Sequence, residues 1–346
     1  MSTVKPQRPW VASTSDRVRD VLIFLGTVIF TYIFVGLTPM NGKLAYFAIF
    51  FITLTAANGI SGFVRYGYAS AKDASLKTLV GFGALITIFP IASILGTVIK
   101  NGYKGIQLNL FKQDMSLATP TDPLTNGGIL HAISGTLILV AVALIMSVPL
   151  GILTALYLTE IRGRFTRPIR FLVQAMSGVP SIVAGLFILS SVLYPITKAY
   201  SGFMGSLALT ILMIPTVART SEEVLNLIPN DLREAGTALG GTQWRTVAMI
   251  VLPAARSGLI TAIILGVARI AGETAPLLLL TGGGDKVNGN PFSGPMGSLP
   301  YYIWKSFSAG SPEAITRAWA GLLVLVVLVL FLFTSARYLS TRKVSR

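Results

Sequence analysis

Two charged residues interrupt one of the most apolar stretches of the chain, GVARIAGETAPLLLL at residues 266–280. Arg269 and Glu273 are four residues apart, so a continuous helix would place them on one face. Because each charge near the centre of a bilayer costs on the order of 3 kcal/mol, both side chains should face protein or water. Gly272 would allow close approach of another helix, and Pro276 would kink this one. We therefore predict that Arg269 and Glu273 form a functional pair within a span, with a purely structural ion pair as the alternative.

Residue types that support catalysis or metal binding are scarce. The chain has no cysteine and one histidine, His131, which argues against thiolate sites and against a histidine metal site. The P-loop pattern G-x-x-x-x-G-K-[ST] does not occur, and TGGGDK at residues 281–286 is no substitute because aspartate precedes the lysine. No nucleophile with acid and base partners is apparent. We predict that the chain is not an enzyme, holds no metal and binds no cofactor of its own.

Composition predicts a polytopic membrane protein. Hydrophobic residues make up 53% of the 346 residues and charged residues 12%, whereas soluble domains contain about 25% charged residues. A helix needs about 20 apolar residues to cross a bilayer. The fold class is therefore all-α, a polytopic transmembrane helical bundle. The eight expected spans are residues 20–39, 44–64, 78–99, 130–158, 169–195, 203–218, 257–281 and 317–337.

The net charge of +15 follows membrane orientation rather than nucleic-acid binding. With the N-terminus inside, the inward segments contain 19 of the 28 Lys and Arg residues and the outward segments contain 8. Such an excess of basic residues is typical of cytoplasmic loops. No cleavable signal peptide is apparent before the first span. We expect a multi-pass protein of a plasma membrane that contacts lipid and no nucleic acid, with both termini cytoplasmic and long outward loops at residues 100–129 and 282–316.

The longest inward loop, residues 219–256, carries helix signals. Thr220 with Glu223 fits a capping box for a first helix, which Pro229 would end. Its apolar residues recur at helical spacing. The loop is therefore expected to project from the membrane as helices rather than as irregular chain.

The rest of this loop predicts a helix, a glycine turn and another helix. Asn230 can cap the first of these, and Gly240 with Gly241 can supply a left-handed turn at its end. Thr242 can cap the last helix, which Pro253 would end. Such an amphipathic unit has an apolar face to bury, either on the membrane surface or in a groove of a soluble partner.

This stretch resembles the EAA loop of ABC importer permeases, whose pattern is E-A-A-x3-G-x9-I-x-L-P. The matching residues are Glu234, Ala235, Gly236, Gly240, Ile250, Leu252 and Pro253. All spacings agree, and one position departs, because the second alanine is Gly236 here. The resemblance implies that the loop docks on a separate cytoplasmic ATPase subunit, chiefly through Glu234 and Gly240. Glycine permits close packing but weakens a helix by about 1 kcal/mol relative to alanine, so we expect a less rigid first helix.

Further motifs resemble the PstA-type permease subunits of phosphate-specific ABC importers over about residues 103–338. They are ARIAGETAPLL at residues 268–278 and, in the same chain order as in that family, GGILHAISGTLILV, PLGILTALYLTE, PSIVAGLF and RAWAGLLVL. The resemblance implies a type I ABC importer permease fold that moves inorganic phosphate inward by alternating access. It makes Arg269 the cationic contact for the anion, since a planar guanidinium matches phosphate oxygens. Glu273 would hold that guanidinium in place and keep phosphate from binding too tightly.

The same resemblance implies the partners and the domain organisation. The partners are a second, PstC-like permease, two PstB-like ATPase subunits that use ATP and Mg, and an extracytoplasmic PstS-like phosphate-binding protein, in a bacterial plasma (inner) membrane. Permeases of this family usually have a six-span core, so the eight spans expected here imply an extra hairpin, which leaves the orientation of the core unchanged. The expected parts are residues 1–99, a cytoplasmic N-terminus and two or three spans with that hairpin; residues 100–338, the permease domain; and residues 339–346, a basic cytoplasmic tail.

Three other functions stay open. A permease for another oxyanion, such as molybdate or sulfate, would share the EAA-like loop and differ in the substrates that compete. An ion-coupled secondary transporter or channel would need neither the loop nor an ATPase. A membrane-bound regulatory partner would sense phosphate supply and transport nothing.

Overall fold

The computed structural model describes residues 14–40 and 42–342, and within these ranges the regular structure is helical apart from one isolated bridge, Gly282–Met296. The expected all-α class is thus confirmed. Residues 1–13 of the expected cytoplasmic N-terminus and residues 343–346 of the expected tail lie outside the described residues. The α-helices are α1 (Thr14–Leu37), α2 (Lys43–Tyr66), α3 (Tyr68–Gly102), α4 (Leu130–Leu156), α5 (Thr166–Ser177), α6 (Ser181–Ile188), α7 (Gly202–Asn226), α8 (Asn230–Ala238), α9 (Gln243–Thr246), α10 (Leu252–Ile270), α11 (Ala275–Leu280), α12 (Leu299–Ala309) and α13 (Pro312–Arg342).

The chain divides into two compact units after Gly96, near the C-terminal end of α3. In the first unit, α2 and α3 meet through small and polar residues. The Asn58 side chain donates to the Thr78 hydroxyl at 2.9 Å, and a Cβ atom on Gly62 would lie 2.8 Å from a backbone oxygen of α3. Small residues allow helix backbones to approach closely within a membrane. The assignment of residues 1–99 to a cytoplasmic N-terminus and two or three spans, including an extra hairpin, stays a prediction.

Seven helical segments among the described residues are long and apolar enough to cross a membrane. They are Thr14–Leu37, Lys43–Tyr66, Tyr68–Gly105, Leu130–Ile161, Gly202–Asn226, Gln243–Ile270 and Pro312–Tyr338. An eighth span is obtained only if Thr166–Ser177 and Ser181–Thr197, which are bent by 105°, are counted together. The expected span 169–195 therefore corresponds to this bent pair, which is broken between α5 and α6, and not to one straight helix. Gly178 follows α5, and Pro180 precedes α6 and disfavours helical conformation at the residue before it.

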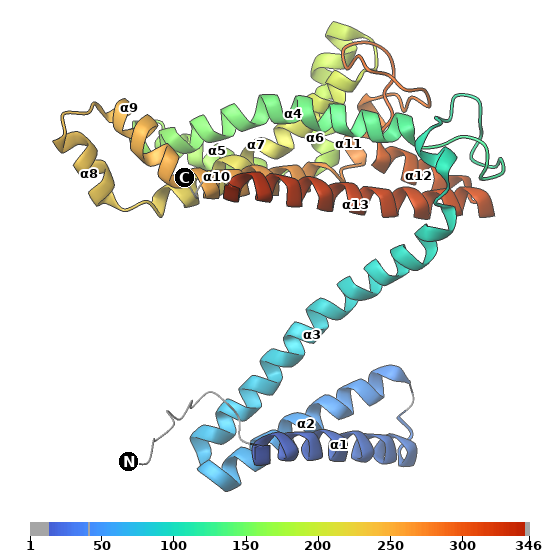
Figure 1. Ribbon diagram of the computed structural model, residues 1–346, viewed down its shortest axis with the longest axis vertical. Coiled ribbons are helices and arrows are strands. Elements are labelled where there is room, and N and C mark those ends of the chain that lie inside the picture. The colour runs from blue at the N-terminus through green and yellow to red at the C-terminus, as the bar shows by residue number, and fades with distance from the viewer. Residues whose placement is uncertain (1–13, 41, 343–346) are drawn as a thin grey trace. The chain divides into compact units, whose positions relative to one another are not determined.

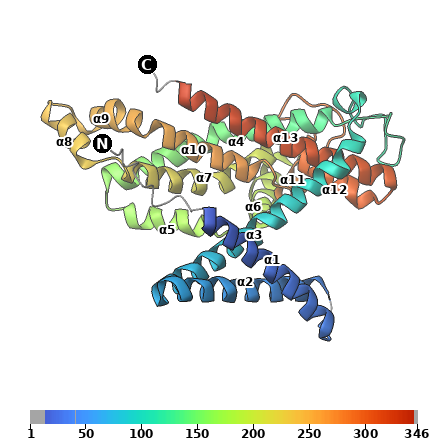
Figure 2. The ribbon, with the colours of Figure 1, turned by 60° about the horizontal axis from the view of Figure 1, so that its bottom comes forward.

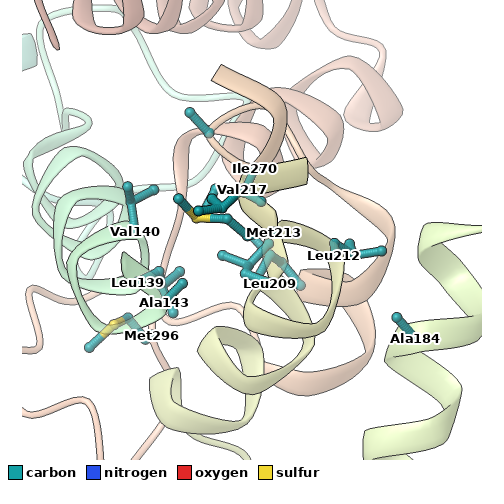
Figure 3. Close-up of a cluster of buried hydrophobic side chains, with 12 residues drawn as sticks. Leu139, Val140, Ala143, Ala184, Leu209, Leu212, Met213, Val217, Ile270 and Met296 are labelled. Atoms are coloured by element: carbon teal, nitrogen blue, oxygen red, sulfur yellow. The ribbon is translucent and has the colours of Figure 1, made fainter. Parts of the chain in front are cut away.

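The second unit is built around α4 and α7. Their buried side chains form one apolar cluster, in which Leu139 of α4 lies close to Leu209 of α7 and Ile270 of α10 contributes from a third helix (Figure 3). A Cβ atom on Gly151 would lie 2.8 Å from Cβ of Val217, so glycine is what permits this approach. This close contact fixes the position of α4 relative to α7, and with it the positions of their ends.

The α8–α9 end of the second unit lies opposite the α12 end (Figure 1), and Figure 2 shows the same separation. At the α12 end, the two long loops are tied together. The Asp114 carboxylate accepts from the Ser116 hydroxyl at 2.6 Å and from the Val287 backbone N–H at 3.2 Å. The Ser116 hydroxyl is the main cause that holds the pKa of Asp114 below its usual value. Buried Arg317 of α13 donates, at 2.7 to 3.1 Å, to the backbone oxygens of Asp122, Pro123 and Asn126.

Candidate functional site

The EAA-like stretch forms a helical hairpin at one end of the second unit, named here the α8–α9 hairpin (residues 230–246). Gly240 has a φ of 79°, which favours glycine, and it reverses the chain between the two helices. The Thr242 hydroxyl accepts from the backbone N–H of Arg245 at 3.4 Å and so caps α9. The expected helix, glycine turn and capped helix are therefore confirmed, with Gly240 and not Gly241 in the left-handed conformation.

Two expected caps are wrong. Helix α7 runs unbroken from Gly202 to Asn226, so Thr220 and Glu223 lie within it and form no capping box. At α8, Pro229 is the N-cap residue, and the side chain of Asn230 does not cap the helix. A capping side chain is needed only where backbone N–H groups lack a helical partner. In α7 the preceding carbonyls already supply those partners.

Pro253 does not end a helix, contrary to expectation. The helical run continues from Gln243 to Ile270, and Pro253 lies in the first turn of α10. A π-helical turn, Val247–Val251, comes directly before α10. Proline is tolerated in the first turn of a helix, and π-turns are places where the hydrogen-bond register changes. One continuous run therefore connects the α8–α9 hairpin with the residues around Arg269.

Gly236, the departure from the family pattern, is the buried residue of the EAA-like set. A Cβ atom at this position would lie 2.6 Å from Cγ2 of Thr246 and 2.8 Å from Cδ1 of Ile250. Glycine therefore lets α8 lie close against α9 and the π-helical turn. This close packing stabilises α8 and counteracts the lower rigidity expected from the low helix propensity of glycine. Of the other predicted docking residues, Ile250 and Leu252 are half-buried, and the exposed ones are Glu234, Ala235, Gly240 and Pro253.

Large apolar side chains of the hairpin and of the π-helical turn that follows it are exposed. Leu239 beside the turn is 88% exposed, Trp244 of α9 is 59% exposed, and Met249 of the π-helical turn is 69% exposed. Exposed apolar side chains next to polar ones are typical of a surface that binds another protein. The hairpin therefore presents both Glu234 and an apolar surface on the side that does not pack against its own chain.

One ion pair that the sequence did not indicate anchors the hairpin to α4. Arg233 of α8 and Glu160, in the π-helical turn Tyr157–Ile161 after α4, are joined by an Nη2–Oε1 distance of 2.8 Å. The Glu160 side chain is 7% exposed. Arg233 also donates to the backbone oxygens of Leu225 and Ile228 near the end of α7, at 2.9 and 2.6 Å. An acidic residue at the end of a span, followed by basic residues, was the available signal.

The structure does not place Arg269 and Glu273 on one helical face. Helix α10 ends at Ile270, and Glu273 lies in the turn before α11. A Cβ atom on Gly272 would meet no neighbouring heavy atom within 4 Å, and Pro276 lies in the first turn of α11 rather than kinking α10. The expected close helix approach at Gly272 is therefore absent within the described residues. Four-residue spacing aligns side chains only in a continuous helix.

Arg269 is nevertheless placed to meet a ligand or another chain. Its side chain is exposed, and Nη1 donates to the Thr216 hydroxyl of α7 at 3.4 Å. Among the described residues, no carboxylate lies within salt-bridge distance of its guanidinium. A guanidinium in an apolar segment needs water, an anion or a polar partner. The arrangement therefore offers an unneutralised cation that can contact an anion.

Comparisons with known proteins agree on a class of membrane transport subunit. Residues 147–345 match the family described as binding-protein-dependent transport system inner membrane component. The phosphate transport system permease protein PstA of Mycobacterium leprae is 40% identical over 266 residues, which cover 75% of this chain and 87% of that protein. PstA of Pasteurella multocida is 38% identical over 275 residues, which cover 79% of this chain and 95% of that protein.

A solved structure gives the same fold. An inward-facing conformation of the MetNI methionine ABC transporter aligns with a TM-score of 0.51 and 20% identity, and the alignment covers 63% of this chain and 95% of that chain. At this identity the likeness bears on the fold alone. The expected type I ABC importer permease fold is consistent with it.

Proposed function

The chain belongs to the family of binding-protein-dependent transport system inner membrane components, and from that premise we propose that it is the membrane permease subunit of an ATP-driven importer of inorganic phosphate. The similarity to PstA permeases carries the proposal because it extends over most of both chains. The chain itself is the non-catalytic subunit, and ATP and Mg belong to a partner ATPase.

Arg269 is the proposed contact for phosphate in transit. Its exposed guanidinium is supported by the Thr216 hydroxyl and has no carboxylate partner among the described residues. A planar set of donors suits bidentate binding of phosphate oxygens. Glu273, four residues further along the chain, adds a negative charge to this region. We propose that this charge limits how tightly phosphate is held, so that the anion can leave.

The α8–α9 hairpin is the proposed docking element for the ATPase. Its exposed Glu234, Leu239 and Trp244 supply the contact surface, with Gly240 at the turn. Motion of the hairpin has two routes into the membrane helices. One is the helical run from Gln243 to Ile270, which spans about 40 Å at 1.5 Å per residue. The other is the Arg233–Glu160 pair, which links α8 to α4.

The proposed assembly contains four kinds of subunit. A second, PstC-like permease completes the pathway, two PstB-like ATPases bind at the cytoplasmic face, and an extracytoplasmic PstS-like protein delivers phosphate. In this orientation the α8–α9 hairpin and both termini are cytoplasmic, in a bacterial plasma membrane. Family membership supports the ATPase and the binding protein as partners, because components of this family serve binding-protein-dependent transport.

Uptake of labelled phosphate in cells with and without this chain tests the proposal, after other phosphate routes have been removed. The chain should confer a component that ATP depletion abolishes and an uncoupler spares, and that excess sulfate or molybdate does not reduce. Competition by sulfate or molybdate would instead indicate a permease for another oxyanion. Loss of the component under the uncoupler alone would indicate ion-coupled transport. Unchanged uptake without the chain would leave a regulatory role and contradict the importer function.

A further inference from the structure

Four arginines line a cavity beside the inner ends of α4, α5 and α7. Its volume is about 590 Å³, and four of its eight lining residues are Arg162, Arg164, Arg167 and Arg170. The cavity lies at the same end of the bundle as the α8–α9 hairpin, because the adjoining π-helical turn Tyr157–Ile161 contains Glu160, the partner of Arg233. Arg269 is not part of its lining.

Most of the positive charge of this cavity is not neutralised within the described chain. Arg170 pairs with Glu222 of α7 at 2.7 Å. Arg162 donates through Nε to a backbone oxygen at 2.8 Å, and the guanidinium of Arg164 lies 4.7 Å from the ring centre of Phe165. Within the described residues, Arg162, Arg164 and Arg167 have no carboxylate at salt-bridge distance. A concave surface lined by one sign of charge concentrates the opposite ion.

Uncharged features of the cavity favour the same kind of ligand. Thr166, the first residue of the 12-residue helix α5, has a buried hydroxyl oxygen without a hydrogen-bond partner among the described residues. The N-terminus of α5 adds partial positive charge. Arg162 adopts a φ of 50°, a conformation that non-glycine residues rarely adopt and that is often found where a site requires it. A donor-rich cavity of this kind fits an anion with several oxygens.

We propose that this cavity binds a phosphate group, presented by the headgroup of an anionic phospholipid. Arginine pairs with phosphate through two parallel hydrogen bonds, which favours phosphate over a small monatomic anion. Phe165, Phe171 and Leu172 are 51%, 74% and 58% exposed next to the arginines, which supplies apolar surface for acyl chains. Basic pockets at the cytoplasmic ends of membrane helices are suited to such headgroups. Free inorganic phosphate is the second source of the same chemical group.

Lipid retention by the purified full-length transporter complex tests the site. The complex is incubated with phosphatidylglycerol or phosphatidylcholine in mild detergent, and bound lipid is counted by native mass spectrometry. The double variant Arg164→Gln/Arg167→Gln is compared with Arg219→Gln/Arg256→Gln, which removes two exposed basic side chains elsewhere. The first variant should lose about 30-fold in affinity for phosphatidylglycerol, which corresponds to about 1 kcal/mol per arginine. The second variant should bind phosphatidylglycerol as the unmodified chain does.

A second pair of measurements separates the two sources and controls for folding. Binding of labelled inorganic phosphate is measured by equilibrium dialysis. If Arg164→Gln/Arg167→Gln loses phosphate binding but binds phosphatidylglycerol as the unmodified chain does, the cavity is assigned to free phosphate. Arg164→Lys/Arg167→Lys keeps both charges, so it should fold and retain an intermediate affinity. Equal binding of both ligands by the unmodified chain and by Arg164→Gln/Arg167→Gln would overturn the proposal. None of these measurements depends on phosphate import.

Discussion

The lack of a Cβ atom at Gly236 allows α8 to pack closely against α9 in the α8–α9 hairpin. A methyl group at this position would overlap Thr246, because its carbon atom would lie 2.6 Å from Cγ2 of that residue. Overpacking of this kind costs about 1 to 3 kcal/mol. Gly236→Ala is therefore expected to weaken binding of the ATPase subunit at least about fivefold, as measured by titration of the purified permease with that subunit.

Thr246 supplies the matched control for this prediction. Thr246→Ala removes Cγ2 and Oγ1, two of the three atoms that a methyl group on residue 236 would meet, and leaves Cδ1 of Ile250, the end of a flexible side chain. The hydroxyl it removes already has no hydrogen-bond partner among the described residues. The double variant Gly236→Ala/Thr246→Ala should therefore bind the ATPase better than Gly236→Ala alone. If both bind equally weakly, the steric explanation is wrong.

Replacement of Arg269 tests whether this residue contacts the transported anion. Arg269→Lys keeps the charge but loses the planar donor set, so phosphate uptake should fall at least about tenfold while ATPase binding stays unchanged. Uptake in proteoliposomes and ATPase binding are measured on the same preparation. Arg256→Lys, an exposed site on the same helix, is the control and should transport normally. Normal transport by Arg269→Lys would remove Arg269 from the pathway.

At the scale of elements, the Arg233–Glu160 pair decides how firmly α8 is held against α4. Arg233→Met leaves a 93% buried carboxylate side chain without its partner, since Glu160 is 7% exposed, and breaking a buried pair in this way costs about 3 to 5 kcal/mol. Residues 230–246 should then exchange backbone hydrogen faster, as measured by mass spectrometry. Phosphate uptake should decline as well, because the loosened hairpin transmits less motion to the membrane helices.

Removing both charges separates the pair from either residue alone. Glu160→Met/Arg233→Met replaces the ion pair by apolar side chains, which is often nearly neutral. The double variant should therefore exchange more slowly in residues 230–246 than Arg233→Met does. If the increases in exchange rate caused by Glu160→Met and by Arg233→Met simply add in the double variant, the ion pair does not hold the hairpin.

Local signals were sufficient for some elements and insufficient for others. The glycine turn at Gly240 and the cap at Thr242 depend on neighbouring residues only, so the sequence predicted both. The continuity of α7 through Thr220 and the break after Ile270 depend on which backbone groups find partners in the folded chain. Local capping and spacing rules therefore gave the wrong boundaries there.

The contacts of the site were harder to predict than its residues. Arg233 and Glu160 are 73 positions apart, and a single sequence does not show that they meet. Glu234 and Gly240 were identified through the loop pattern, and both are exposed on the hairpin as docking requires. For Arg269 the residue type indicated an anion contact, whereas its hydroxyl partner on α7 followed only from the packing of α7 against α10.

At the scale of the whole molecule, helices α1 and α2 of the first compact unit are predicted to be dispensable for coupled transport. Residues 1–66 contain α1 and α2, and removing two spans leaves the orientation of the remaining chain unchanged. A chain that begins at residue 67 should still bind the ATPase and import phosphate, as measured in the same proteoliposomes. Normal membrane insertion and ATPase binding with loss of uptake would instead show that α1 and α2 are needed for transport.

The most direct test of the central claim is phosphate transport by the purified components. The chain, a second permease and the ATPase are reconstituted in vesicles with the binding protein and labelled phosphate outside, and ATP enclosed inside. Uptake should require both ATP and the ATPase subunit, stop with vanadate, persist with an uncoupler, and fall in step with ATP hydrolysis in Gly236→Ala. Uptake driven by an ion gradient without the ATPase would contradict the claim that the α8–α9 hairpin couples ATP hydrolysis to phosphate movement.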